Sequence, residues 1–428
     1  MPLSRALRPD LAFYGVSAAF ALATAFASEF YGYRVWGNSA SVGYLAALVL
    51  TLWIALTGGA GRGLRSRWAP AVVAWVPATL VPIGVLVVKR SPAFVWGQWP
   101  WAFPAQPEVW VIERSARALF ADGTPYLDLD TLNRAPHPDD YTPYGPSMTV
   151  FGMPRALFGD HPLTDARIAF LVVTLAALAL TWRVLDRPGV PVGAAQLLLV
   201  SPLTALTLAV AGDDVAVVAL VVLGGALAYR AHPGWAGLLC AVLITMKLTA
   251  LPAAAVLAVG VAAHRGGRGL AAFLGWLAGG AAAIVLPVLL VDPASFVEHV
   301  IKFPVGLGRA GSPASSPLPG HLIAATGPVG HVLALVLLVA AAVAVTAWLL
   351  LRPPHTAADA MLRTASGLGA AILLAPATRW GYLVYPVVLL GAVVAFAAAG
   401  DPRDRAGTRV RPGSVEPDSA PTTPIPPR

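Results

Sequence analysis

The chain has 428 residues, of which 57% are hydrophobic and only 12% are charged, and its formal net charge is +8. A soluble globular domain carries roughly twice that charged fraction. The composition therefore predicts an all-α polytopic membrane protein, because lipid leaves no water to satisfy exposed backbone groups. The single cysteine, Cys240, excludes a disulfide framework and a cysteine metal cluster. The positive charge is poor support for a nucleic-acid partner, since basic residues in membrane proteins set orientation.

Apolar stretches of about the length needed to span a bilayer recur along the whole chain. They predict a bundle of about 11–13 transmembrane helices. The predicted spans are 11–28, 41–58, 69–88, 165–185, 190–211, 213–230, 235–248, 250–263, 269–291, 329–352, 364–377 and 381–399.

The spans divide the chain into four parts. We expect N-terminal spans in 1–90, a polar loop in 91–163, the main bundle with a second outer loop (292–328) in 164–400, and a disordered tail in 401–428. Basic residues cluster in the short connections between spans. Placing these clusters in the cytoplasm predicts an integral protein of the cell membrane with cytoplasmic termini, and it puts the large loop on the extracytoplasmic side.

The large loop is rich in acids, aromatic residues and prolines. Pro107 is well placed at the first turn of a helix that runs to about Phe120 and ends at Asp122-Gly123. Apolar residues share one face of this helix, while Glu113, Arg114 and Arg117 share another, which predicts a helix lying along the membrane surface. The apolar stretch Met148–Phe158 is too short to cross and predicts a second interfacial or re-entrant helix.

Two cations lie deep in apolar sequence where helices are interrupted. Lys247 lies at a break near Pro252, and Arg379 lies at a break between Pro376 and Tyr385. A cation at such depth needs an anionic partner or a route to water. A bound phosphate would satisfy both, whereas the alternative is pairing with acids of the bundle or snorkelling to the interface. Irregular backbone at this depth is tolerated where it is buried in protein or lines a wet cavity.

Glu108, at the start of the predicted loop helix, is the leading candidate for a general base that takes a proton from a hydroxyl. The competing interpretation is an acid that complements the helix N-terminus, which is common.

Other acids and aromatic residues are candidates for sugar contacts. Adjacent acids among aromatic residues can hold sugar hydroxyls and stack on a pyranose ring, although Asp139-Asp140 could equally open a turn. An acidic pair after Gly212 marks a helix start at the membrane edge, where N-capping is the alternative role. Tyr382, beside Arg379, could also be an interfacial aromatic residue. The candidate substrate-binding residues are Asp139, Asp140, Tyr141, Tyr144, Asp213, Asp214, Lys247, Arg379 and Tyr382.

We predict no metal site and no cofactor. The Asp213-Asp214 pair could bind a divalent ion, but no third ligand stands at helical spacing. The chain has no Walker loop, no zinc-protease motif and no hydrolase nucleophile motif, and it lacks the strand context of a dinucleotide fingerprint. An activated substrate is therefore expected to arrive through the membrane.

Several short motifs resemble a known family. They are Glu108 opening a helix, Ala116–Leu119 (Ala-Arg-Ala-Leu), Gly123–Tyr126 (Gly-Thr-Pro-Tyr), Tyr141–Pro143 (Tyr-Thr-Pro), the acidic turn at Asp213, and Ile244–Lys247 (Ile-Thr-Met-Lys). Over roughly residues 105–270 the chain is similar to GT-C membrane glycosyltransferases, most closely to glycosyltransferase family 87. In two respects it departs from the family: the acid is usually Asp rather than Glu, and the loop usually follows the first span rather than the third.

The resemblance implies a polyprenol-phosphate-mannose-dependent mannosyltransferase. In it, Glu108 would be the base of a single inverting displacement, Asp213 or Asp214 a sugar contact, and Lys247 with Arg379 a phosphate clamp. The implied partners are a polyprenyl-phosphate-linked sugar donor, a glycolipid or glycan acceptor of the cell envelope, and membrane lipids, with no nucleic acid.

Two other classes of function fit the residues. Broken helices with a central lysine and arginine also suit a transporter or flippase of a lipid-linked or anionic substrate. A transporter needs gates on both faces, however, and this chain places its polar residues on one. The third class is a non-catalytic assembly subunit whose loop binds another envelope protein.

Overall fold

The computed structural model describes residues 7–90, 104–311 and 313–400. Within these residues the chain forms helices and no strands. Nine of the described helices are long and apolar enough to cross a membrane. The prediction of an all-α polytopic membrane protein is thereby confirmed. The predicted tail and residues 91–103 of the large loop lie outside the described residues.

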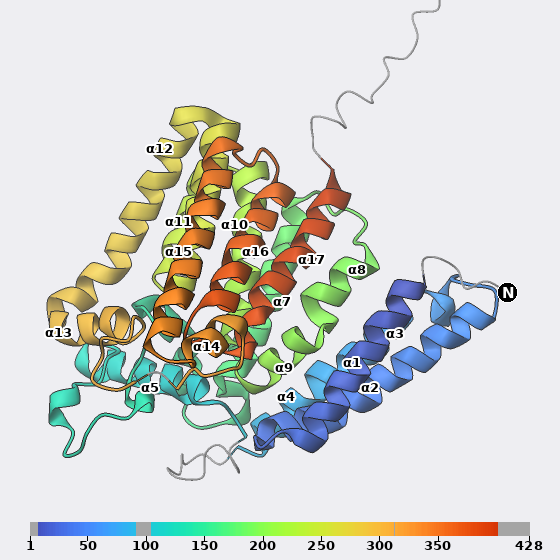
Figure 1. Ribbon diagram of the computed structural model, residues 1–428, viewed down its shortest axis with the longest axis horizontal. Coiled ribbons are helices and arrows are strands. Elements are labelled where there is room, and N and C mark those ends of the chain that lie inside the picture. Colours follow the sequence, from blue (N-terminus) through green and yellow to red (C-terminus); the bar gives the residue numbers. More distant parts are fainter. Residues whose placement is uncertain (1–6, 91–103, 312, 401–428) are drawn as a thin grey trace, which may run out of the picture.

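The N-terminal helices form a separate sheaf beside the main bundle, drawn in blue in Figure 1. They are α1 (Arg8–Ala27), α2 (Tyr31–Leu56), α3 (Trp68–Trp75), η2 (Val76–Leu80) and α4 (Val81–Val88). Buried hydrogen bonds connect these N-terminal helices to one another and to the main bundle. The Trp36 indole donates to the Ala78 carbonyl at 2.8 Å, and the Tyr44 hydroxyl donates to the Val200 carbonyl of the main bundle at 2.6 Å.

Helix α2 begins ten residues earlier than the predicted span 41–58, which was wrong at that end. The polar residues Gly37–Ser41 lower the local hydropathy, so a span predicted from hydropathy begins after them. The serine hydroxyls of this run are satisfied within the protein: Ser41 donates to the Gly37 carbonyl of the same helix at 2.6 Å, and Ser39 donates to the Pro77 carbonyl of η2 at 2.6 Å. Gly37 also lets α1 approach closely, since a Cβ there would lie 2.5 Å from the Ala25 nitrogen.

The main bundle fills the centre of Figure 1. Its helices are α7 (Ala166–Val184), α8 (Val192–Ala195), η7 (Gln196–Val200), α9 (Pro202–Val210), α10 (Asp213–Arg230), α11 (Pro233–Ile244), α12 (Leu251–Val291), α15 (Pro328–Leu351), α16 (Ala357–Leu374) and α17 (Val384–Ala399). Helix α16 begins before the predicted 364, because Thr356 caps it through the Asp359 amide at 3.1 Å.

Helix α12 consists of two arms that meet at Gly266, whose φ of 69° only glycine adopts readily. The first arm ends where Arg265 donates to the Tyr229 and Ala231 carbonyls, at the end of α10. The second arm returns to the level of the large loop, where Val291 lies beside Gly123. The nine spanning candidates count α12 as a single helix and include neither α10 nor the shorter apolar helix α11.

Short helices from both outer loops gather at one end of the bundle (Figure 1). They are α5 (Pro107–Asp122), η3 (Leu129–Thr131), η4 (Pro138–Asp140), η5 (Pro146–Phe151), α6 (Met153–Phe158), η6 (Pro162–Thr164), α13 (Pro293–Phe296), η9 (Val297–Lys302) and α14 (Pro319–Ala324). The predicted loop helix is thus present, and Gly123 ends it with a left-handed φ of 73°. The predicted helix Met148–Phe158 is instead two short helices that meet at Gly152, which packs against the Ile112 carbonyl.

The polar face predicted for α5 is wrong in one respect, because Glu113 is buried with only 2% of its surface exposed. Two arginines compensate its charge: Arg90 at 2.6 Å and Arg155 at 3.3 Å. Arg90 also contacts Asp165 at 2.7 Å, just before α7. A buried ion-pair network therefore anchors this helix into the protein.

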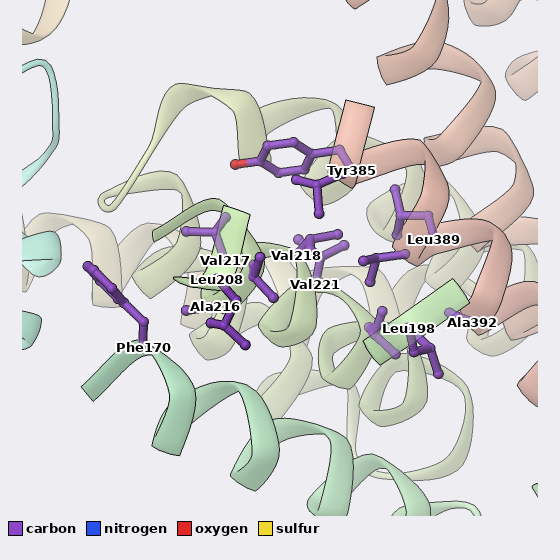
Figure 2. Close-up of a cluster of buried hydrophobic side chains, with 14 of the residues drawn as sticks. Phe170, Leu198, Leu208, Ala216, Val217, Val218, Val221, Tyr385, Leu389 and Ala392 are labelled. Atoms are coloured by element: carbon purple, nitrogen blue, oxygen red, sulfur yellow. The ribbon is translucent and has the colours of Figure 1, made fainter. Parts of the chain in front are cut away.

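A hydrophobic core lies between α7, α9, α10 and α17 (Figure 2). Valines of α10 fill its centre, and Phe170 and Leu389 close it from two sides. Tyr385 packs its ring on this core while its hydroxyl points away from the aliphatic side chains. The start of α10 and the start of α17 are thereby held against each other, which fixes the polar groups that these two helix ends carry.

Candidate active site

Both predicted helix breaks are present. Lys247 has extended backbone angles (φ −150°, ψ 130°) between α11 and α12, and Arg379 has similar angles (φ −126°, ψ 143°) between α16 and α17. An extended residue between two helices turns its side chain out of the helical packing. Each break therefore presents its cation to neighbouring elements.

Lys247 is paired with both acids at the start of α10. Its Nζ lies 2.9 Å from Asp213 Oδ2 and 2.5 Å from Asp214 Oδ1. All three side chains are at most 11% exposed. Of the two roles considered for this lysine, the structure realises pairing within the bundle. Two carboxylates therefore share one ammonium.

Tyr385 and Thr249 complete this group. The Tyr385 hydroxyl donates to Asp214 Oδ1 at 2.7 Å and lies 3.1 Å from the Thr249 hydroxyl. The hydrogen bonds of the two acids therefore converge on Asp213 Oδ2 and Asp214 Oδ1. The other oxygen of each carboxylate has no hydrogen bond within the described chain. Two fixed, partly unused carboxylates suit the binding of adjacent sugar hydroxyls.

The second charged group pairs Glu108 of α5 with Arg379. The Glu108 side chain is 17% exposed and that of Arg379 is 37% exposed. One oxygen, Glu108 Oε2, is buried and has no hydrogen-bond partner in the part of the chain that the structure describes. A buried carboxylate oxygen without a donor is costly and calls for an explanation.

Tyr144 and Tyr382 bring the two charged groups together. The Lys247 ammonium lies 5.4 Å from the centre of the Tyr144 ring and 5.6 Å from that of Tyr382, in cation–π range. The charges of Lys247 and Glu108 both act on each of these two phenols. The acid of the large loop and the cation of the bundle therefore border one region.

The large loop is fastened directly to the first helix break. The Gly145 amide donates to the Met246 carbonyl at 3.0 Å, and the Ser147 hydroxyl donates to the Val242 carbonyl at 2.8 Å. A Cβ at Gly145 would lie 2.1 Å from the Thr245 oxygen, so only glycine permits this approach. The contact sets Tyr144 over Lys247.

The predicted Asp139–Tyr141 cluster separates into different environments. Burial raises the pKa of Asp139, His137 opposes that rise, and the charges of Glu108 and Arg379 also act on it, which places Asp139 beside the second charged group. Asp140 instead pairs with Arg134 at 2.6 Å and accepts the His137 amide. Burial would raise the pKa of Asp140, but these hydrogen bonds outweigh it and hold the pKa below its ordinary value. Asp140 thus shapes the loop.

Tyr141 joins the two outer loops rather than entering the charged region. Its ring stacks on Phe303 with centroids 4.0 Å apart, and its hydroxyl lies 3.2 Å from Glu298 Oε1. Beside it, His299 accepts the Thr142 amide at 2.9 Å and lies 2.8 Å from the Leu127 carbonyl. Burial lowers the pKa of His299 to about 4, so the ring is neutral at physiological pH.

Four residues of this region were not among the predicted site residues. Tyr385 and Thr249 are described above; Gln106 precedes α5, and its side-chain amide donates to the Tyr33 hydroxyl of α2 at 2.5 Å. Tyr385 could have been predicted from the sequence, because it lies close to the helix break at Arg379. Tyr33 had no such signal, because its helix was predicted to begin later in the chain.

No group of three or more His, Cys, Asp or Glu side chains in residues 7–90, 104–311 and 313–400 is arranged to hold a metal ion.

Comparison with known proteins identifies the family. The sequence pattern of Glycosyltransferase family 87 matches residues 141–377, more than half of the chain. No curated protein and no solved structure matches significantly. The matched range includes Asp213, Asp214 and Lys247, whereas Glu108 precedes it and Arg379 follows it. The chain is a membrane-embedded glycosyltransferase that belongs to glycosyltransferase family 87.

Proposed function

We propose that this glycosyltransferase moves a sugar, with mannose as the favoured candidate, from a polyprenyl-phosphate carrier to a hydroxyl of an envelope glycolipid or glycan. The reaction takes place on the extracytoplasmic face of the cell membrane and inverts the anomeric centre. Family membership supports the transferase class over a transporter or an assembly subunit. The membrane helices support a donor that reaches the site through lipid.

The observation that carries the proposal is the unpartnered oxygen of Glu108. Its carboxylate is held by Arg379 on one side, while Oε2 is buried without a donor in the described chain. A hydroxyl that donates to Oε2 would satisfy it. The same contact is what a general base needs in order to take that proton.

The displacement is concerted. The acceptor oxygen forms a bond to the anomeric carbon as the bond from that carbon to the phosphate oxygen breaks. The acceptor proton passes to Glu108, and polyprenyl phosphate leaves with the bonding electrons. Holding both reactants at one site supplies much of the rate enhancement through orientation alone.

The roles of the remaining residues follow from their charges. The unused oxygens of Asp213 and Asp214 bind hydroxyls of the donor sugar, and Asp139 with Tyr144 and Tyr382 borders the same region. Arg379 is the better phosphate contact, because 37% of its side chain is exposed and it has a single acidic partner. Lys247 is already paired with two acids, so it acts as a positioning residue that holds them.

The test uses purified protein in lipid nanodiscs with labelled polyprenyl-phosphate-mannose and a total membrane lipid extract as acceptor. Glu108→Gln removes the base but keeps the side-chain size. We expect turnover to fall by at least about 100-fold, the lower range for general-base catalysis, while donor affinity stays within a few-fold of wild type. Asp122→Asn is the matched control, since this exposed acid lies at the other end of the same helix.

Two results would refute the proposal. Full activity of Glu108→Gln, with Asp122→Asn also active, would remove Glu108 from the mechanism. Vesicles that carry the labelled lipid across the membrane without forming any glycosylated product would favour the flippase interpretation instead.

A further inference from the structure

The N-terminal sheaf reaches the charged region through one side chain, Tyr33 at the start of α2. Tyr33 belongs to a helix far upstream of the family-matching range 141–377. Any role it has is therefore a property of this chain that the family pattern does not describe.

Tyr33 is held in place from the loop side. Its hydroxyl accepts a hydrogen bond from the Gln106 side chain at 2.5 Å. Gln106 in turn is fixed by its backbone, whose amide donates to the Val210 carbonyl at the end of α9 at 3.0 Å. Glu108 follows two residues later, and the charges of Glu108 and Arg379 both act on the Tyr33 phenol.

Near the start of α5, the hydrogen bonds of the described chain leave a donor at Tyr33 and an acceptor at Glu108 unused, and Glu108 lies two residues after the Gln106 that holds Tyr33. Tyr33 uses a lone pair to accept from Gln106, so its own O–H proton remains available, with no acceptor for it in the described chain. Glu108 Oε2 is an acceptor without a donor. A single hydroxyl group satisfies both, because it donates its proton to Glu108 and accepts one from Tyr33. Its second lone pair stays free to attack the anomeric carbon.

The geometry points to Tyr33 as a residue that binds and orients the acceptor hydroxyl, which makes α2 part of the active site. This inference rests on the proposed function of Glu108 as the base. The ligand it recognises is an alcohol of a glycan or glycolipid headgroup, rather than the phosphate of the donor, since a phosphate offers no proton to Glu108.

Tyr31 provides a matched control on the same helix. Its hydroxyl lies 3.3 Å from the Lys89 ammonium at the end of α4, in an exposed setting. Removing either hydroxyl changes one oxygen atom in the first turn of α2. Of these two hydroxyls, only that of Tyr33 is hydrogen-bonded to Gln106 among the described residues.

The test compares Tyr33→Phe with Tyr31→Phe in nanodiscs, with labelled polyprenyl-phosphate-mannose as donor. Octyl α-mannoside is the acceptor in one arm, and a total membrane lipid extract is the acceptor in the other. For Tyr33→Phe we expect the acceptor KM to rise about tenfold, the effect of one lost hydrogen bond, with the donor KM changed by less than about twofold. Tyr31→Phe is expected to keep the wild-type acceptor KM. Gln106→Leu, which frees the Tyr33 hydroxyl, is expected to raise the acceptor KM by a smaller factor.

The outcomes separate the inference from the proposed function. An unchanged acceptor KM in Tyr33→Phe, with active wild-type protein, overturns the inference alone. Equal rises in the donor and acceptor KM also overturn it, because they indicate a general disturbance of the site. Absence of sugar transfer by wild-type protein in both arms overturns the proposed function, and the inference with it.

Discussion

Lys247 illustrates how a buried cation at a helix break can be satisfied by acids of the same bundle. Its ammonium sits between Asp213 and Asp214 at 2.9 and 2.5 Å. Two adjacent carboxylates in a poorly solvated place repel each other, and the ammonium between them offsets this repulsion. The sequence alone left two partners open for this lysine, a phosphate or these acids. Only the positions of α10 and of the α11–α12 break decide between them.

We predict that Lys247→Met destabilises the protein by about 3–5 kcal/mol, the cost of leaving a buried charge without its partner. Chemical unfolding in mixed micelles measures this change. The double variant Lys247→Met/Asp214→Asn is expected to recover part of the loss, because it removes the repulsion between the two acids. Equal stability of the single and double variants would show that Lys247 contributes by packing alone.

At the scale of whole elements, helix α5 was predictable and its environment was not. Pro107 and Gly123 mark its ends in the sequence, and the structure places the helix at Pro107–Asp122. The ion-pair partners of Glu113 are Arg90 and Arg155, which lie far from it in the chain on either side of α5. Periodicity alone assigned Glu113 to a solvated face, since a sequence does not reveal which distant arginines will cover an acid.

The same limit explains which candidate site residues could be predicted from the sequence and which could not. Glu108, Lys247 and Arg379 stand out as charges beside helix boundaries, and the structure groups each of them with a counter-ion. Tyr33 is an ordinary aromatic residue in sequence. It reaches Gln106, just before α5, because α2 extends to Tyr31 through the polar turns that hydropathy excluded.

The buried ion pairs around α5 predict that substitutions at different positions of this helix differ strongly in their effect on stability. Glu113→Ala should lower the free energy of unfolding by about 3–5 kcal/mol, because Arg90 and Arg155 lose a buried counter-ion. Arg117→Ala, one turn further on, removes an ion pair with Asp160 in which the arginine is 53% exposed. That variant should cost less than about 1 kcal/mol. Thermal unfolding in detergent measures both, and similar effects from the two variants would contradict the anchoring role of Glu113.

At the scale of the whole molecule, the candidate site lies at one end of the main bundle, and the basic end of α10 lies at the other. The ends of α10 and α17 meet where Arg230 contacts the Gly400 carbonyl. The short helices of both outer loops gather at the opposite end, with α5 (Figure 1). A transferase that uses a lipid-carried donor needs only one such face, which agrees with the concentration of polar groups there.

This separation of the two ends predicts which parts of the chain face each side of the membrane. Cysteine labelling can test the prediction because the chain has one cysteine. Its one cysteine, Cys240, is only 1% exposed within α11 and is replaced by alanine to give a cysteine-free background. Asp122→Cys then marks the exposed end of α5, and Gly189→Cys marks the connection between α7 and α8, where a side chain meets open space.

We expect a membrane-impermeant maleimide to label Asp122→Cys on intact cells and to label Gly189→Cys only after permeabilisation. The physical reason is that positively charged connections stay in the cytoplasm, and Gly189 follows Arg183 and Arg187 directly. Activity of both variants serves as the control for correct folding. Labelling of Gly189→Cys on intact cells, with Asp122→Cys protected, would reverse the orientation and place the glycosyl transfer on the cytoplasmic face.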